Sequence, residues 1–265
     1  MKKLLKSVAR KLGFGEPRRE PQPQVVNVTD AAAKNAAAPT QDAFLAMQSL
    51  VAQPNPVIFD VGANIGQTAQ RFRSLFPAAT IHSFEPFPDS HEALRLALIG
   101  DSHALAHRLA LADAAGSATF HVNRFNATNS LLPSDDRAQL YWGNNLLDTE
   151  AHITVPTQTV DAFCREGSIE QIHILKIDVQ GAEYAVLSGA RQMLLDQAID
   201  LIYMEVIMAP TYVGQRKAHE YLSLFDSYDY ELFGIYNLVH CRGRLIQTDN
   251  IMVSARFLQR YERHG

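Results

Sequence analysis

The sequence predicts an α/β fold with a Rossmann-like, seven-stranded sheet that is mostly parallel and carries an antiparallel C-terminal hairpin. Short apolar segments rich in β-branched residues, beginning with VIFDV at 57–61, alternate with helical patterns along most of the chain. Such alternation is typical of a parallel sheet with helices on both faces. The last two apolar segments, at 230–237 and 250–258, lack a helix-length connection, so we expect them to pair antiparallel.

The individual elements follow from residue 42 onward. Asp42 is a suitable N-cap for the first helix, and Pro54 ends it. Helices are expected at 42–53, 67–75, 90–99, 184–195 and 219–228. Strands are expected at 57–61, 79–86, 103–113, 118–123, 152–160, 172–179, 200–206, 230–237 and 250–258. The strands at 118–123 and 152–160 flank a polar loop and interrupt the alternation.

Composition restricts the class of protein. The chain has 265 residues, 47% of them hydrophobic, which is enough for one substantial core. A formal net charge of −4 argues against general nucleic-acid binding, because nothing would offset phosphate repulsion. The two cysteines, Cys164 and Cys241, exclude a disulfide framework and argue against a cysteine-based zinc site. With no long apolar run and no signal-peptide pattern, we expect a cytoplasmic location.

The N-terminal residues 1–41 are expected to lie outside the folded domain, which then spans 42–265. Residues 1–14 place Leu4, Val8 and Leu12 on one helical face, and residues 1–20 hold seven basic and two acidic side chains. Such a basic amphipathic segment suits peripheral contact with the inner face of a membrane or with a partner, and a solvated tail is the alternative. The rest, to residue 41, has the proline and alanine content of a flexible linker.

The motif DVGANIG follows the first strand and indicates a ligand site. Ligands of open α/β sheets bind beyond the carboxyl ends of the strands, and Gly62 and Gly66 allow a tight turn there. The next helix N-terminus suits a carboxylate, and Asp60 suits an ammonium. An amino acid carries both groups, and so does S-adenosylmethionine. Asn64 replaces the middle glycine of GxGxxG, which disfavours a pyrophosphate, and an ordinary glycine turn is the alternative.

Two further acidic residues extend this candidate site. Glu85 ends the second strand, 25 residues after Asp60, where nucleotide-binding folds place a carboxylate on a ribose diol. The alternative for Glu85 is an exposed residue at a strand end. Asp113 ends the third strand and suits either an adenine amino group or a cap of the turn at Gly116.

Together these segments resemble the FkbM family of methyltransferases. The matching segments, spread over about 55–257, are DVGANIGQTA, SFEPFP, ALADAAGSATFHV, VPTQTVDAFC and ILKIDVQGAEYAVLSGA. The resemblance implies a methyltransferase sheet, S-adenosylmethionine as the methyl donor, and O-methylation of a hydroxyl on a sugar, glycan or polyketide-type small molecule. It does not extend to the basic N-terminal segment.

Catalytic candidates lie at the ends of two central strands. Methyl transfer to a hydroxyl needs an aligned acceptor and a group that takes its proton. Asp178 ends the KID strand and Glu205 ends the YMEV strand, so both are expected at the carboxyl edge of the sheet. Lys176 lies on the same strand face as Asp178 and would lower its pKa. Glu183 is either a third candidate or a helix-start carboxylate favoured by the helix dipole.

The segment between the paired strands supplies weaker candidates. His121 and His152 are more typical of surface positions than of catalysis, and Asn126 and Asn129 are weak candidates for lining the acceptor pocket. Tyr141 and Trp142 suit either stacking on a sugar ring or a hydrophobic anchor. No motif supports a divalent metal, so we expect none.

Two other functions fit the same fold. A nicotinamide-dependent oxidoreductase is disfavoured by the GxNxG loop and by the absence of a Tyr-xxx-Lys pair. A non-catalytic nucleotide-binding module is disfavoured by the several carboxylates at one sheet edge.

Overall fold

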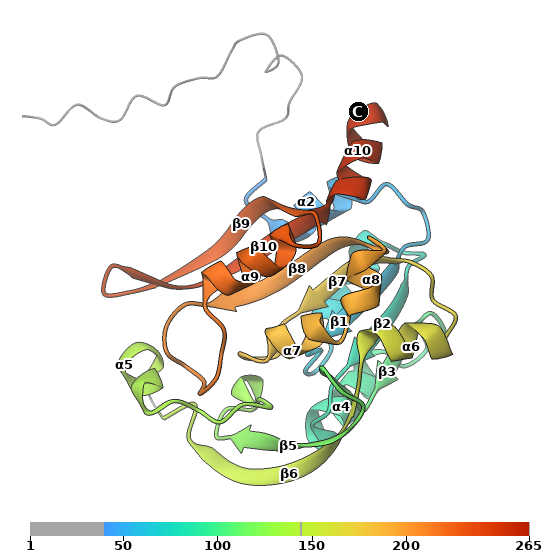
Figure 1. Ribbon diagram of the computed structural model, residues 1–265. Helices are drawn as coiled ribbons and strands as arrows, with labels where there is room; N and C mark the ends of the chain where they lie inside the picture. Colours follow the sequence, from blue (N-terminus) through green and yellow to red (C-terminus); the bar gives the residue numbers. More distant parts are fainter. Residues whose placement is uncertain (1–39, 144, 265) are drawn as a thin grey trace, which may run out of the picture. The chain divides into compact units, whose positions relative to one another are not determined.

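The computed structural model describes residues 40–143 and 145–264 and is built on one seven-stranded sheet (Figure 1). The strand order is β3-β2-β1-β7-β8-β10-β9. These strands are β1 (Val57–Val61), β2 (Thr80–Phe84), β3 (Ala104–His107), β7 (Ile172–Ile177), β8 (Ile199–Ile207), β9 (Tyr230–Cys241) and β10 (Arg244–Ser254). The first five in the sheet are parallel, whereas β10 is antiparallel to both β8 and β9. The predicted fold class is confirmed.

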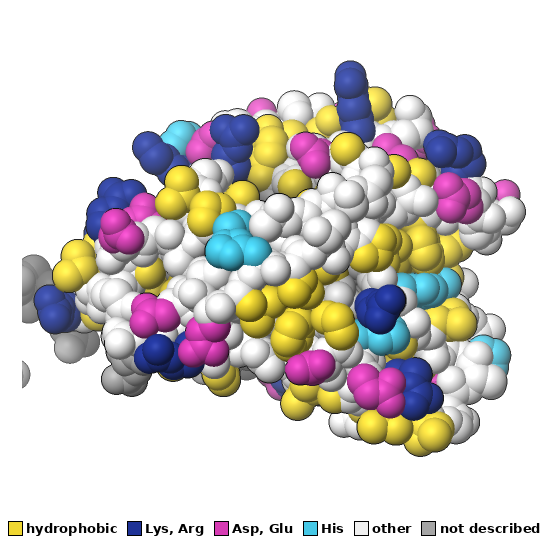
Figure 2. Space-filling model, turned by 90° about the horizontal axis from the view of Figure 1, so that it is seen from below, with side chains coloured by type: hydrophobic (Ala, Val, Ile, Leu, Met, Phe, Trp, Pro, Cys, Tyr) yellow, Lys and Arg dark blue, Asp and Glu magenta, His cyan; other side chains and the backbone are white. Residues whose placement is uncertain are grey.

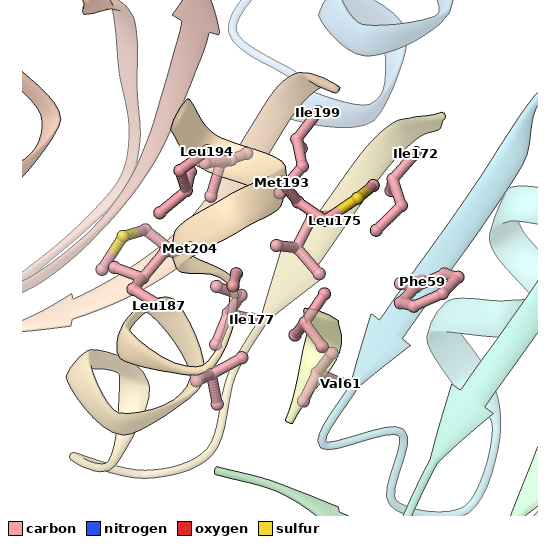
Figure 3. Packing of buried hydrophobic residues seen from close by; sticks show 14 of the residues in the cluster. Phe59, Val61, Ile172, Leu175, Ile177, Leu187, Met193, Leu194, Ile199 and Met204 are labelled. Atoms are coloured by element: carbon pink, nitrogen blue, oxygen red, sulfur yellow. The ribbon is translucent and has the colours of Figure 1, made fainter. Parts of the chain in front are cut away.

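Alternate residues of the central strands face two helical layers, because successive side chains of a strand point to opposite faces. Ile58 and Ile174 pack against one layer, made of α2 (Ala43–Leu50), α3 (Gln67–Leu75), α4 (Pro88–Ala97) and α10 (Ala255–His264). Phe59 and Leu175 pack against the other, made of α6 (Val160–Glu166), α7 (Glu183–Ser188), α8 (Arg191–Leu195) and α9 (Ala218–Asp226). Figure 3 shows side chains of β1, β7 and β8 meeting those of α7 and α8 in this second layer.

The first helix of the described residues begins at the predicted N-cap. The Asp42 carboxylate accepts a hydrogen bond of 2.9 Å from Phe44 N and caps α2. The helix ends at Leu50, before Pro54. The predicted membrane- or partner-binding segment at 1–14 and most of the predicted linker lie outside the described residues. Within the described part of the chain, every helix is too short or too polar to cross a membrane.

Several element boundaries differ from the prediction, and three of the differences change how the chain is arranged. The expected strand 103–113 is divided into β3 and β4 (Ala110–Leu111), and β4 joins a second sheet of order β4-β6-β5. The expected helix 184–195 is divided into α7 and α8 at Gly189, where a Cβ would lie 2.0 Å from the Ala112 carbonyl oxygen. The expected last strand ends at Ser254, whose hydroxyl accepts from Phe257 N at the start of α10.

The second sheet carries a segment that covers the carboxyl edge of the main sheet. Its long strands β5 (Gly116–Asn123) and β6 (Thr149–Gln158) are joined by residues 124–148, here called the cover segment. Hydrogen bonds tie it to the main sheet side: Tyr212 Oη to Thr128 O at 2.9 Å, and Ser130 Oγ to Gln180 O at 2.7 Å. Figure 2 views the molecule from the side where β5 and β6 lie in Figure 1, and shows hydrophobic side chains exposed between acidic and basic ones.

Candidate active site

The glycine loop after β1 is held tightly against the end of β7. Gly62 has φ +76°, and a Cβ on it would lie 1.8 Å from the Asp178 carbonyl oxygen. Only glycine fits such an approach without moving the backbone. Gly66, at φ +92°, is the left-handed residue before α3, and Asn64 is also left-handed at φ 47°. The loop thereby directs the N-terminus of α3 toward the space above the sheet.

Asp60 forms a buried ion pair with Lys176. The two residues are opposite one another in the β1–β7 register, and Lys176 Nζ lies 2.9 Å from Asp60 Oδ1. The ammonium also donates to Gly62 O at 2.8 Å. Burial alone would lower the pKa of Lys176, but the nearby Asp60 and Asp178 carboxylates outweigh it and raise that pKa.

This placement changes the role expected for Asp60. Its side chain is fully buried. It does not line the cavity that lies between the carboxyl edge of the sheet and the cover segment, whereas Lys176 does. The structure therefore favours a role for Asp60 in holding Lys176 over the expected direct contact with a ligand ammonium. Lys176 in turn is hydrogen-bonded to the glycine loop and ion-paired with Asp60 rather than with Asp178.

Glu85 lies where the sequence places it, at the wall of the cavity. Its two carboxylate oxygens accept from Asn64 N and from Phe87 N, each at 2.9 Å. Burial raises the pKa of Glu85, and these two backbone N–H groups and the Lys176 charge partly offset that rise. The carboxylate thus links the glycine loop to the end of β2, and each oxygen retains a lone pair for a ligand hydroxyl.

The first cavity, as we call it, lies between the carboxyl edge of the sheet and the cover segment. Gly62 and Asn64 of the loop line it, together with Glu85 and Asp178. The start of α3 contributes Gln67 and Thr68, and an apolar wall comes from Phe84, Leu109, Ala110, Leu111 and Phe120. From the cover segment come Asn126, Ala127, Asn129 and Leu131. The two asparagines, weak candidates from sequence, therefore lie at the cavity.

Asn129 has an unusual hydrogen-bonding state. Its Oδ1 accepts from Asn123 N at 2.7 Å, but its Nδ2 is buried and has no acceptor among the described residues. A buried donor without a partner is unfavourable by about 1–3 kcal/mol. Because Asn129 lines the first cavity, an acceptor atom of a bound ligand would satisfy this donor.

Asp178 and Glu205, the predicted catalytic pair, are joined by Gln180. Gln180 Nε2 donates to Asp178 Oδ1 at 2.8 Å and to Glu205 Oε2 at 2.9 Å. Its Oε1 accepts from the Tyr212 hydroxyl at 2.9 Å, and Gln247 Nε2 lies 2.6 Å from Glu205 Oε1. Asp178 lines the first cavity, whereas Glu205 is 8% exposed and lies behind Gln180.

The environments of the two carboxyls differ. Burial, and after it the nearby Asp178, Glu183 and Asp249 charges, raises the pKa of Glu205 well above its ordinary value. A neutral Glu205 can position a neighbouring group by hydrogen bonding but is a poor proton acceptor. Asp178 is half-buried at the cavity surface, so it is the better placed of the two to take a proton from an acceptor.

Replacing Glu205 by glutamine should change how stability depends on pH. The pKa of Glu205 is raised above its ordinary value of 4.5, so the folded state binds this proton more tightly than the unfolded state. The resulting stabilisation is present below pH 4.5 and is lost as the pH rises through the raised pKa. The measurement is the free energy of unfolding of wild type and Glu205→Gln against pH.

Wild type should lose stability relative to Glu205→Gln as the pH rises above 4.5. The matched control is Glu170→Gln, a change at an exposed glutamate, which should leave the wild-type profile unaltered. Parallel curves for wild type and Glu205→Gln would show that the Glu205 carboxyl titrates alike in both states.

Other sequence candidates lie away from the first cavity. Asp113 is exposed and lines a different, shallow depression beside Tyr184. Glu183 is buried and accepts from Val179 N and Gly181 N, which supports the helix-start alternative. Burial raises the pKa of Glu183 to about 7. For Asp113, the exposed position outside the first cavity does not support the predicted adenine contact.

The remaining candidates also have other partners. His121 and His152 contact each other across β5 and β6, and neither lines the first cavity. Tyr141 Oη accepts from Arg244 Nη1 at 2.8 Å. Among residues 40–143 and 145–264, no three His, Cys, Asp or Glu side chains are grouped to hold a metal ion, and the expectation of a metal-free site stays a prediction.

Several site residues were not singled out from the sequence. Gln180 lies inside the IDVQGAE motif and has a left-handed backbone conformation, with φ 57°. Its place in the sequence between Asp178 and Glu183 was a usable signal that it belongs to the site. Gln247 and Tyr212 come from segments without a motif. They reach the site through the β8–β10 register and through the turn after β8, which long-range packing determines.

Comparison with known families decides the class of this site. The family model described as the methyltransferase FkbM domain matches residues 60–232, a range that contains the glycine loop, Glu85, Asp178 and Glu205. The chain belongs to the FkbM family of methyltransferases. The FkbM assignment removes the nicotinamide-dependent oxidoreductase from consideration.

Three proteins similar to this FkbM-family chain carry different names. The 2-O-methyltransferase NoeI of Sinorhizobium fredii is 29% identical over 68% of this chain and 75% of that protein. The hexuronic acid methyltransferase AglP of Haloferax volcanii is 27% identical over 58% of this chain and 57% of that protein. The 31-O-demethyl-FK506 methyltransferase FkbM of Streptomyces tacrolimicus is 31% identical over 52% and 60%, respectively.

Among solved structures, a methyltransferase FkbM from Methylobacillus flagellatus KT is similar to this chain. The alignment covers 75% of this chain and 44% of that one, with 13% identity and a TM-score of 0.47.

Proposed function

We propose that this protein is an S-adenosylmethionine-dependent O-methyltransferase that acts on a hydroxyl of a sugar, glycan or polyketide-type small molecule. The observation that carries the proposal is the position of Asp178. This carboxylate lies at the end of a central strand and lines the first cavity together with the glycine loop and Glu85. Donor-binding groups and a proton acceptor thus share one cavity.

The first cavity has the chemical groups that S-adenosylmethionine requires. The N-terminus of α3, at Gln67 and Thr68, presents N–H groups suited to the carboxylate of the methionyl part. Glu85 suits the ribose diol, and the wall at Leu109–Leu111 suits the adenine ring. The unpaired Nδ2 of Asn129 supplies one further donor for a ligand acceptor atom.

The donor, when bound, supplies an electrophilic methyl group on a sulfonium. The acceptor oxygen forms the new C–O bond as the C–S bond breaks, and the hydroxyl proton passes to Asp178 Oδ2. Gln180 holds Asp178 Oδ1, which leaves Oδ2 for the acceptor. Glu205, held by Gln180 and Gln247, fixes the orientation of the Gln180 amide.

The acceptor class is supported by the names of the relatives. One is a 2-O-methyltransferase, another acts on a hexuronic acid, and a third on 31-O-demethyl-FK506. Sugar-type and macrocyclic acceptors therefore both occur among proteins similar to this one.

Transfer of a tritiated methyl group tests this function. The purified protein is incubated with [methyl-³H]-S-adenosylmethionine and with sugar, glycan and macrolide alcohols as acceptors. We expect label in an alkali-stable methyl ether and equimolar S-adenosylhomocysteine. Alkali-labile label would indicate a methyl ester on a carboxyl group, and would overturn the proposed attack by a hydroxyl.

A further inference from the structure

A second cavity adjoins the first and shares two of its lining residues, Ala127 and Gln180. The cover segment forms one side of this second cavity, and the end of β8 with the turn after it forms the other. Its apolar lining comprises Phe125, Trp142, Leu146, Leu147 and Ile207. The second cavity is thus an apolar space separated from the first by the residue that joins Asp178 to Glu205.

The polar side chains along the second cavity already have partners in the protein. Trp142 Nε1 donates to Thr211 Oγ1 at 2.8 Å, and Thr211 Oγ1 donates to Ala209 O at 3.1 Å. Thr128 Oγ1 lies 2.8 Å from Phe125 O and 3.1 Å from Leu146 O, so its single proton has two carbonyl acceptors within reach. A ligand hydroxyl placed against these walls would lose its bonds to water without an equivalent replacement.

The inner end of the second cavity is different, because two glutamines that line it are hydrogen-bonded to acidic side chains of the candidate site. Gln180 and Gln247 both line this cavity and both hold the Glu205 carboxyl. Gln180 also holds Asp178, which faces the first cavity. A hydroxyl that extends past Gln180 into the first cavity would therefore reach Asp178, whereas the rest of the ligand contacts apolar side chains.

We propose that the second cavity holds the methyl acceptor, and that the acceptor is an alcohol carried on an apolar body. Its hydroxyl extends past Gln180 into the first cavity, beside Asp178, and its apolar face packs against Phe125, Trp142 and Ile207. The assignment rests on the methyltransferase function proposed above and narrows its acceptor. Among sugar-type and polyketide-type alcohols, it selects those whose ring or chain carries few hydroxyls near the one that is methylated.

Trp142 is the single tryptophan of the chain and lines the second cavity, so its fluorescence can report on binding there. The probes are cyclohexanol and myo-inositol, which have the same six-membered carbon ring but one and six hydroxyls. Each is titrated into the protein saturated with S-adenosylhomocysteine. We expect a saturable fluorescence change with cyclohexanol and none with myo-inositol over the same concentrations.

Two phenylalanine variants locate the binding. Phe125 is 51% exposed and lines the second cavity, whereas Phe233, on β9, is 43% exposed and lies outside it. Both side chains are exposed enough for serine to be tolerated by the fold. Phe125→Ser should weaken cyclohexanol binding at least about threefold through lost apolar contact, and Phe233→Ser should leave it unchanged.

The outcomes separate the two proposals. Any of three results would overturn the apolar acceptor site. These are a linear, non-saturating response to cyclohexanol, equal effects of the two variants on cyclohexanol binding, and stronger binding of myo-inositol than of cyclohexanol. In each of these cases, S-adenosylhomocysteine binding measured by calorimetry would leave the methyltransferase function standing. Failure of S-adenosylhomocysteine to bind would instead contradict the function itself.

Discussion

Asp178→Asn should lower the turnover of methyl transfer by about 10²–10⁴-fold, the usual contribution of a general base. Asparagine keeps the shape and the Oδ1 acceptor that Gln180 Nε2 uses, but it takes no proton. A hydroxyl is a weak nucleophile while it keeps its proton, so the loss should fall on kcat. The measurement is steady-state transfer to the acceptor identified by tritium labelling, with S-adenosylhomocysteine affinity measured in parallel.

The matched control is Asp226→Asn, a change at an exposed aspartate at the end of α9, which should leave kcat unchanged. Near-normal turnover of Asp178→Asn would show that another group takes the proton. A joint loss of donor affinity and activity would place Asp178 in the donor site instead of at the acceptor.

Gly62→Ala should abolish S-adenosylhomocysteine binding and destabilise the fold strongly. The new Cβ would lie 1.8 Å from the Asp178 carbonyl oxygen, so the glycine loop and the end of β7 would have to separate. That separation would displace Lys176 and Asn64 together, because both are bonded to the loop or belong to it. Thermal unfolding and calorimetric titration measure the two effects.

Gly100→Ala is a closely matched control. Gly100 has φ +87°, similar to +76° for Gly62, but an added Cβ there meets no atom within 4 Å. It should show only the backbone strain of a left-handed alanine, about 1–2 kcal/mol. If the two variants were equally destabilised, contact with Asp178 would not be what requires glycine at 62.

The sequence predicts the main sheet well because its central strands are buried on both faces. A segment such as IHILKI, which forms β7, gives a continuous apolar run that is flanked by helical patterns. The candidate site residues follow from the same segments, since ligands bind beyond the carboxyl ends of parallel strands. Glu85 and Asp178 come directly after β2 and β7, and Glu205 lies near the end of β8. Each of these three therefore had a local signal.

Other features depend on partners that are distant in sequence. The run ALAHRLALA is equally apolar in β3 and in β4, so nothing local shows where the chain leaves the main sheet. Asp60 was expected to contact a ligand, but the β1–β7 register places Lys176 opposite it, 116 residues away. Gln247 reaches Glu205 only through the pairing of β10 with β8.

Calorimetric titration of S-adenosylhomocysteine into wild type and Glu85→Ala tests the central claim, that the first cavity binds the methyl donor. We expect wild type to bind one equivalent and Glu85→Ala to bind about 1–3 kcal/mol more weakly, through loss of charge-assisted bonds to the ribose. Glu170→Ala, a change at an exposed glutamate, should bind as wild type does. No binding by wild type, or equal affinity of wild type and Glu85→Ala, would contradict the donor site described for this cavity.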